Sequence, residues 1–139
     1  MTVIGYLSGT FDLFHVGHLN IIKQARTNCD HLVVGVHESG AWKGKPTFIP
    51  FDERIEIVRS VKFVDRAVKS TPHDTEIWHE IRYNKLFVGS DYFGSERFKR
   101  YEEFFMDKGV SVVYFPYTQT TSSSQIRALV NGTIEHGFD

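Results

Sequence analysis

The stretch TVIGYLSGTFDLFHVGH, residues 2–18, decides the beginning of the fold because its pattern changes along its length. Residues 2–7 form a short apolar run that is typical of a buried strand. The small polar residues 8–10 favour a turn, and an amphipathic pattern begins at or near Gly17. The sequence therefore predicts a strand, a turn at the carboxyl edge of a sheet, and a helix.

The same alternation continues along the whole chain. Further buried strands are predicted at residues 31–37, 64–70, 85–90 and 110–115. Helices are predicted at residues 17–28, 51–61, 74–83 and 96–109, with a final helical pattern at 125–132. Strands that alternate with helices predict an α/β fold, a Rossmann-like doubly wound sheet of about five parallel strands with helices on both faces. Ligands of such sheets bind beyond the carboxyl ends of the strands.

Length and composition predict one ordinary folded domain over residues 1–139, with 41% hydrophobic and 24% charged residues. The net charge of −1 argues against nucleic acid as a partner. The chain has no apolar run long enough for a membrane span and no positively charged leader. Its one cysteine, Cys29, cannot form an internal disulfide, so we expect a cytoplasmic protein.

Two histidines stand three residues apart at the predicted start of the first helix. His15 and His18 share a helix face at this spacing, and Gly17 leaves the backbone open to a large ligand. Free N–H groups at a helix N-terminus favour an anion, so the pattern favours a phosphate site. The plainer alternative is that both rings cap or pack the first turn. Zinc is a weaker alternative, because there is no cysteine pair or third histidine at ligand spacing nearby.

The stretch SGTFDLFHVGH resembles the H-x-G-H motif of the cytidylyltransferase family of nucleotidyltransferases, in which both histidines contact the phosphates of the nucleotide. The resemblance extends along nearly the whole chain. Its further segments are ARTNCDHLVVGVHE, WKGKPTFIPFDERIEIVRSVKFVD, LFVGSDY and TSSSQIR. The length and these landmarks are most similar to glycerol-phosphate cytidylyltransferases, which make CDP-glycerol for cell-wall or capsular polymers.

The resemblance implies an enzyme that joins CTP to a small phosphorylated alcohol, with glycerol phosphate favoured, and releases pyrophosphate. It also implies Mg²⁺ carried with the nucleotide and a homodimer. Within the superfamily, ATP is the alternative nucleotide. A second alternative, from another class of protein, is a regulatory module that binds a nucleotide without turnover.

Cationic side chains and N–H donors are the groups that this reaction needs, since it brings two anions together. The residues that we expect to act in catalysis are His15, His18, Lys43, Lys45 and Arg54. Without the resemblance, Lys43 and Lys45 would be a solvated turn. Arg54 would be a surface charge paired with a neighbouring acid, although the first turns of a helix disfavour a cation.

The remaining nucleotide contacts are expected at the ends of strands and at the start of the last helix. These residues are Gly9, Thr10, Phe11, Asp12, Gly17, Asp91, Thr118, Ser122 and Ser123. Asp91 with Asp12 could help to hold Mg²⁺, or could orient a donor or cap a helix. Ser122 and Ser123 could cradle the β- and γ-phosphates, and plain N-capping would account for one of them.

One position departs from the family pattern. Glycerol-phosphate enzymes carry an arginine in an R-T-x-G-I-S-T-T segment, whereas this chain has Tyr117 at that place. A tyrosine can stack on a base or form a hydrogen bond through its hydroxyl, but it lacks the positive charge and the paired N–H donors of an arginine guanidinium. We therefore expect Tyr117, or Arg127 as a substitute, to contact the acceptor. The aromatic stretches at residues 100–105 and 114–117 predict an exposed apolar patch at a subunit contact.

Overall fold

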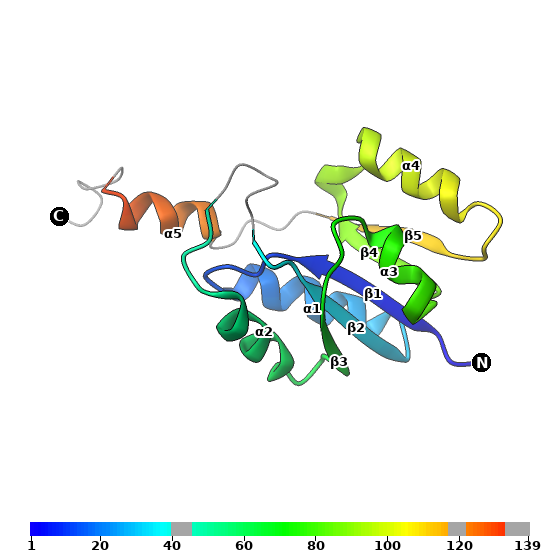
Figure 1. Ribbon diagram of the computed structural model, residues 1–139, viewed down its shortest axis with the longest axis horizontal. Coiled ribbons are helices and arrows are strands. Elements are labelled where there is room, and N and C mark those ends of the chain that lie inside the picture. The colour runs from blue at the N-terminus through cyan, green and yellow to red at the C-terminus, as the bar shows by residue number, and fades with distance from the viewer. Residues whose placement is uncertain (40–45, 117–121, 133–139) are drawn as a thin grey trace.

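The computed structural model describes residues 1–39, 46–116 and 122–132. Five parallel strands form one sheet in the order β3-β2-β1-β4-β5 (Figure 1). The strands are β1 (Ile4–Gly9), β2 (His31–Val36), β3 (Arg66–Lys69), β4 (Lys85–Gly89) and β5 (Ser111–Phe115). The α-helices are α1 (Val16–Thr27), α2 (Phe51–Arg59), α3 (Asp74–Ile81), α4 (Glu96–Phe105) and α5 (Ser123–Val130), and η2 (Ser90–Tyr92) is a short 3₁₀ helix. The predicted fold class is confirmed.

The sheet has an apolar cluster on each face. One cluster joins Leu7 of β1 to Ile22 of α1 and Val58 of α2. The other joins Tyr6 of β1 to residues of α3 and α4, among them Trp78. Since neighbouring residues of a strand point to opposite faces, α1 and α2 cover one face and α3 and α4 cover the other. In Figure 1, α3 and α4 accordingly lie across the sheet from α2.

The first strand continues two residues beyond its predicted end. Ser8 pairs with Gly35 and Gly9 pairs with Val36, so both belong to β1 rather than to the turn. Pairing with β2 overrides the turn preference of the small residues. Gly35 also makes room for the Tyr6 side chain, because a Cβ there would lie 2.0 Å from the Tyr6 hydroxyl oxygen.

All five α-helices end one to four residues before their predicted ends, and the last helix also begins earlier than predicted. Helix α3 stops before Arg82, whose φ of 56° places it in the left-handed region. Helix α4 stops at Phe105, and the chain then turns through Gly109, where φ is 70°. Helix α5 begins at Ser123, so the predicted start at residue 125 is two residues late.

None of the described aromatic residues of the predicted patch is fully exposed, and Phe104 and Tyr114 are half-buried. Tyr101, Phe105 and Phe115 are buried in the two core clusters. The helical period of α4 turns Tyr101 and Phe105 to the core, since they are four residues apart. Phe93 and Met106 are the strongly exposed apolar side chains of this region. None of the described helices is both long and apolar enough to cross a membrane.

Candidate active site

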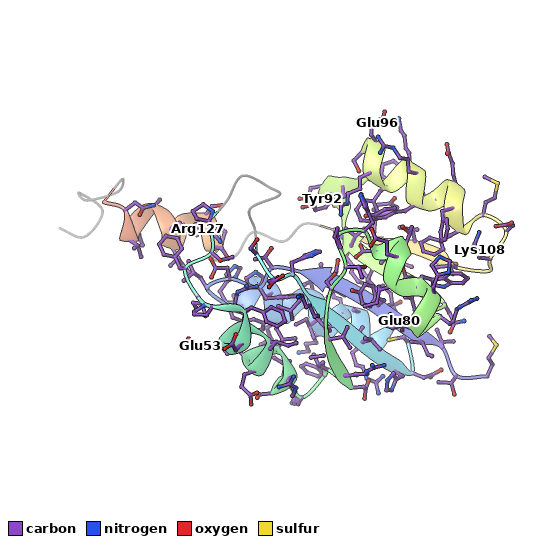
Figure 2. All side chains as sticks on the ribbon, viewed as in Figure 1. Glu53, Glu80, Tyr92, Glu96, Lys108 and Arg127 are labelled. Carbon is purple, nitrogen blue, oxygen red and sulfur yellow. The ribbon has the colours of Figure 1, made fainter. Side chains whose placement is uncertain are left out.

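A cavity of about 460 Å³ opens at the carboxyl ends of β1 and β4. The chain builds β2 and β3 on one side of β1 and then β4 and β5 on the other, so the order reverses at this point. Crevices at such a reversal are the usual ligand sites of open α/β sheets. The cavity is lined by eleven predicted site residues, namely Gly9, Thr10, Phe11, Asp12, His15, Gly17, His18, Asp91, Ser122, Ser123 and Arg127. Figure 2 labels Arg127 on α5 and Tyr92, another lining residue, after β4.

The turn between β1 and α1 is strained. Phe11 and Leu13 both have φ of 53°, a conformation that residues other than glycine seldom adopt. The Phe11 ring is buried against the His18 ring, with their centroids 5.4 Å apart. A Cβ at Gly9 would lie 3.0 Å from the Phe11 ring, so glycine lets this ring fold back under the turn. Strained backbone of this kind is concentrated at functional sites.

The two histidine rings are held in one tautomer. The backbone N–H of Gly17 donates to Nδ1 of His15 at 3.0 Å, and the backbone N–H of His15 donates to Nδ1 of His18 at 3.2 Å. Because each Nδ1 accepts a hydrogen bond, a neutral ring carries its proton on Nε2. His15 is also the N-cap of α1. Both rings therefore cap the first turn, as the plainer alternative predicts, and each still has an N–H donor at Nε2.

Burial disfavours the charged form of both rings. It lowers the pKa of His15 below its ordinary value. Burial, the His15 ring and the Arg127 guanidinium together lower the pKa of His18 to about 3, against a small opposing effect of Asp12. A lowered pKa makes an imidazole a poorer proton acceptor near neutral pH, but its N–H remains a hydrogen-bond donor. Both rings are thus suited to donate to an anion.

Asp12 ties the turn to two distant segments. Its Oδ1 accepts from the N–H of Ile49 at 3.0 Å, and its Oδ2 accepts from the N–H of Phe48 at 2.9 Å and from Nη2 of Arg127 at 2.8 Å. The Ser123 hydroxyl donates to the backbone carbonyl of Asp12 at 2.7 Å. Burial raises the pKa of Asp12, but the hydrogen bonds from Phe48 and Ile49 and the Arg127 guanidinium outweigh this and hold the pKa below its ordinary value.

Arg127 provides a cation at the same end of the cavity. Its side chain is 16% exposed, and its buried Nε has no hydrogen-bond partner among the described residues. An unpaired N–H of an arginine beside a cavity favours an anionic ligand. We call His15, His18 and Arg127 the donor end of the cavity.

The start of α5 adds backbone donors beside Arg127. Ser122 is the N-cap and accepts from the N–H of Gln125 at 3.1 Å, while its own N–H donates to Gln125 Oε1 at 3.3 Å. Ser122 and Ser123 both line the cavity. Two helix N-termini, those of α1 and α5, thus border one cavity, and their dipoles favour negative charge there.

This combination of fold and site has a counterpart among known proteins. Residues 6–129 match the model of the cytidylyltransferase-like family. The chain belongs to this family.

The relatives of this chain within the family have the names of different enzymes. Ethanolamine-phosphate cytidylyltransferase of Arabidopsis thaliana is 44% identical over 71 residues, which make up 49% of this chain and 17% of the plant protein. FAD synthase of Thermococcus kodakarensis is 28% identical over 137 residues, or 93% of this chain and 90% of that protein. The chain spans less than a fifth of the ethanolamine-phosphate cytidylyltransferases of Arabidopsis thaliana and Mus musculus.

The fold has a close counterpart among solved structures. A lipopolysaccharide core biosynthesis protein from Thermoplasma volcanium superimposes with a TM-score of 0.72 at 21% identity. The match covers 87% of this chain and all of the other.

Arg54, which the family resemblance assigns to phosphate, lies outside the cavity lining. It is only 1% exposed, and its side chain donates to backbone carbonyls. Nε donates to Ile49 at 2.8 Å, Nη1 donates to Thr10 at 2.8 Å and to His37 at 2.6 Å, and Nη2 donates to Glu38. The alternative of a surface charge paired with a neighbouring acid is wrong. Arg54 stabilises the loops around the cavity, and its contact with phosphate stays a prediction.

Lys43, Lys45, Tyr117 and Thr118 lie outside the described residues. Their roles stay predictions.

The carboxylates of the described residues do not form a metal centre. Within these residues, no group of three His, Cys, Asp or Glu side chains could hold a metal ion. Both oxygens of Asp12 accept from N–H groups, and Arg127 places a positive charge beside it. Asp12 therefore does not fit a Mg²⁺ ligand. Asp91 belongs to η2, is exposed and lines the cavity. Its side chain does not cap a helix.

Sequence reasoning missed several polar residues of the cavity wall, among them Ser8 and Asp74. Ser8 and Asp74 both line it, and the Ser8 hydroxyl donates to Oδ1 of Asp74 at 2.7 Å. Ser8 was expected in the turn. Asp74 is the first residue of α3, a position where an acidic side chain is common. The sequence therefore gives no indication that this side chain bonds to a residue 66 positions away.

Proposed function

We propose that the protein transfers a cytidylyl group from CTP to a small phosphorylated alcohol, with release of pyrophosphate and glycerol phosphate as the leading acceptor. Membership of the cytidylyltransferase-like family supports the reaction class. The observation that carries the proposal is the pair of imidazoles at the start of α1, each with Nδ1 occupied and Nε2 left as a donor.

The reaction needs no covalent intermediate. A phosphate oxygen of the acceptor attacks the α-phosphorus of the nucleotide, the bond from that phosphorus to the bridging oxygen breaks, and pyrophosphate takes the electron pair. The protein has to hold two anions together and stabilise the charge that develops on the transferring group. The Nε2 donors of His15 and His18 would bond the α- and β-phosphates. Arg127 and the start of α5 would hold the end of the triphosphate.

Mg²⁺ enters the proposal as an ion that the nucleotide carries. It would shield phosphate charge, and Asp12 would not be its ligand. We also propose a homodimer, which light scattering of the purified protein would test.

The nucleotide and the acceptor are the finer parts of the proposal. Similarity to the ethanolamine-phosphate cytidylyltransferases supports CTP as the nucleotide. It also makes ethanolamine phosphate the second acceptor to test. ATP is the second candidate nucleotide, because the FAD synthase similarity covers 93% of this chain and the name of that product implies an adenylyl group.

One assay tests the whole proposal. Pyrophosphate release is measured with CTP or ATP against a panel of phosphorylated polyols and amino alcohols, with the His15→Ala variant as the negative control. We expect release with CTP and glycerol phosphate or ethanolamine phosphate. Release with ATP alone would replace CTP by ATP. Calorimetric binding of a nucleotide without release for any acceptor would instead identify a regulatory binding module.

A further inference from the structure

One arm of the cavity runs along α1, away from the turn that follows β1. His18, Ile21 and Gln24 all line the cavity, and they follow one another at three-residue spacing. Residues at this spacing are neighbours on a helix surface, so the three side chains form one stripe along α1. Gln24 also lines a second hollow of about 290 Å³ together with Asn20 and Lys23 of the same helix. It therefore stands at the end of this arm.

The ends of β4 and β5 supply apolar groups to the same arm. Phe87, Phe115 and Pro116 line the cavity, and the two phenylalanine rings are stacked, with their centroids 5.4 Å apart and an angle of 13° between their planes. Both rings belong to the apolar cluster on the sheet face that α1 covers, and Ile21 packs against this cluster. We call Ile21, Gln24, Phe115 and Pro116 the uncharged arm of the cavity.

Gln24 is the only one of these four residues whose side chain forms hydrogen bonds, and none of the four is ionisable. Its backbone carbonyl accepts from the Thr27 hydroxyl at 2.7 Å and from Nδ2 of Asn28 at 2.9 Å. Its side chain is exposed, and within the described part of the chain no hydrogen bond joins its amide to another residue. The amide thus offers a donor at Nε2 and an acceptor at Oε1 to a ligand.

The uncharged arm has the length and the chemistry that a nucleoside needs. Gln24 lies six residues after His18, which corresponds to about 9 Å along the helix axis. A nucleotide with its phosphates at the donor end can extend its ribose past Ile21 and bring its base to Gln24. Aromatic and apolar walls suit a flat ring that stacks, and an amide suits a base edge that presents a donor beside an acceptor.

We propose that the uncharged arm is the subsite for the nucleobase and that Gln24 is the residue that contacts the hydrogen-bonding edge of the base. This inference rests on the proposed function, which places the phosphates at the donor end. Oε1 of Gln24 would accept from the amino group of cytosine or adenine, and Nε2 would donate to the neighbouring ring nitrogen. Uracil presents a carbonyl oxygen where cytosine presents its amino group, so the amide would have to turn over to bind it.

Two ligands that share the triphosphate test the subsite by calorimetric titration in the presence of Mg²⁺. CTP and ribose 5-triphosphate differ only in the base, and Kd should be at least about tenfold lower for CTP. In Gln24→Leu, Kd for CTP should rise about tenfold, while Kd for ribose 5-triphosphate stays within about twofold. Asn20→Leu is the matched control, because Asn20 is another amide of α1 and does not line the cavity. It should leave both Kd values unchanged, and thermal unfolding checks the fold of each variant.

A second variant distinguishes contact with the base edge from a merely structural role. In Gln24→Glu the side chain can only accept hydrogen bonds, so it still suits the amino group of cytosine but opposes the carbonyl oxygen of uracil. The ratio of Kd for UTP to Kd for CTP should therefore be at least about fivefold higher than in the parent. The added negative charge acts on both triphosphates alike and cancels from this ratio. ITP and ATP provide the same comparison for a purine.

The base subsite and the transferase proposal can fail separately. An unchanged Kd for CTP in Gln24→Leu, or an unchanged ratio in Gln24→Glu for both nucleotide pairs, would overturn the base subsite and leave the transferase proposal intact. If CTP or ATP binds but no acceptor gives pyrophosphate, the transferase proposal fails, and the same titrations still decide the base subsite. Absence of binding for both nucleotides would overturn both proposals.

Discussion

The donor end and the pair formed by Ser8 and Asp74 belong to one cavity but differ in how their residues are held. At the donor end, two imidazoles and Arg127 line the cavity beside the starts of α1 and α5, and the hydrogen bonds that both rings accept are local in sequence. Ser8 and Asp74, by contrast, come together across 66 residues of chain. The contrast teaches that the donor end can be predicted from a local motif, whereas the pairing of Ser8 with Asp74 depends on contacts between distant segments.

The largest effect is expected from breaking the donor end itself. His15→Ala and His18→Ala each remove one Nε2 donor, and turnover with CTP should fall about 10²- to 10³-fold, as for other oxyanion donors. His79→Ala, which alters an exposed histidine of α3, is the control. The measurement is kcat from pyrophosphate release. If both variants stay within a few-fold of the parent, the nucleotide tail binds elsewhere.

A second change separates Arg54 from the arginine of the donor end. Arg54→Met leaves four buried or half-buried carbonyls without their donor, so the free energy of unfolding should fall by about 2–3 kcal/mol. Arg59→Met on the same helix removes an exposed pair with Glu56 and should cost less than about 1 kcal/mol. Urea unfolding measures both. Full stability of Arg54→Met with a selective loss of CTP binding would instead assign Arg54 to phosphate.

A third change tests whether Asp12 positions the donor end. Asp12→Asn removes the charge that Arg127 pairs with and one of the acceptors of the Phe48 and Ile49 N–H groups. We expect KM for CTP to rise about tenfold, while the preference between glycerol phosphate and ethanolamine phosphate stays unchanged. Steady-state kinetics with each acceptor measure both quantities. A changed acceptor preference would show that the donor end and the acceptor site are coupled through Asp12.

The pH dependence of stability distinguishes the buried rings from the carboxylates. The pKa of His18 is about 3 in the folded protein and near 6.5 in an unfolded chain, so the unfolded state binds more protons below pH 6.5. Stability present above pH 6.5 should therefore be lost as pH falls, by up to about 1.4 kcal/mol per pH unit.

Urea unfolding between pH 6.5 and pH 4.5 separates the effect of the two histidines from that of Asp12, because Asp12 contributes only below about pH 4. The slope should be smaller in His18→Gln and unchanged in His79→Gln. Equal slopes in the parent and in His18→Gln would contradict the low pKa of His18.

The smallest effect is expected from the cap of α5. Ser122→Ala removes the acceptor for the N–H of Gln125 and should destabilise α5 by about 1 kcal/mol. Because α5 carries Arg127, KM for CTP should rise a few-fold, and Ser122→Asn should restore most of the loss. An unchanged KM in Ser122→Ala would show that the start of α5 does not contact the nucleotide.

The sequence predicts most of the fold because strand and helix periods are local properties. All five strands and the five α-helices lie where the patterns place them, within a few residues at the ends. The eleven predicted residues in the cavity lining follow from the same logic, since parallel strands end at one edge of the sheet. Arg54 shows the limit, because its helix position gives no sign that its donors reach the carbonyls of three other segments.

The sequence by itself determined the order of strands and helices and the histidine pair at the start of α1, because both depend on residues a few positions apart. Tertiary structure alone decided that Ser8 extends β1, that Asp12 joins α5 to the first turn, and that Asp74 faces the cavity. The physical reason is that hydrogen bonds between distant segments form only when packing on the two faces of the sheet has brought their carbonyls and carboxylates within reach.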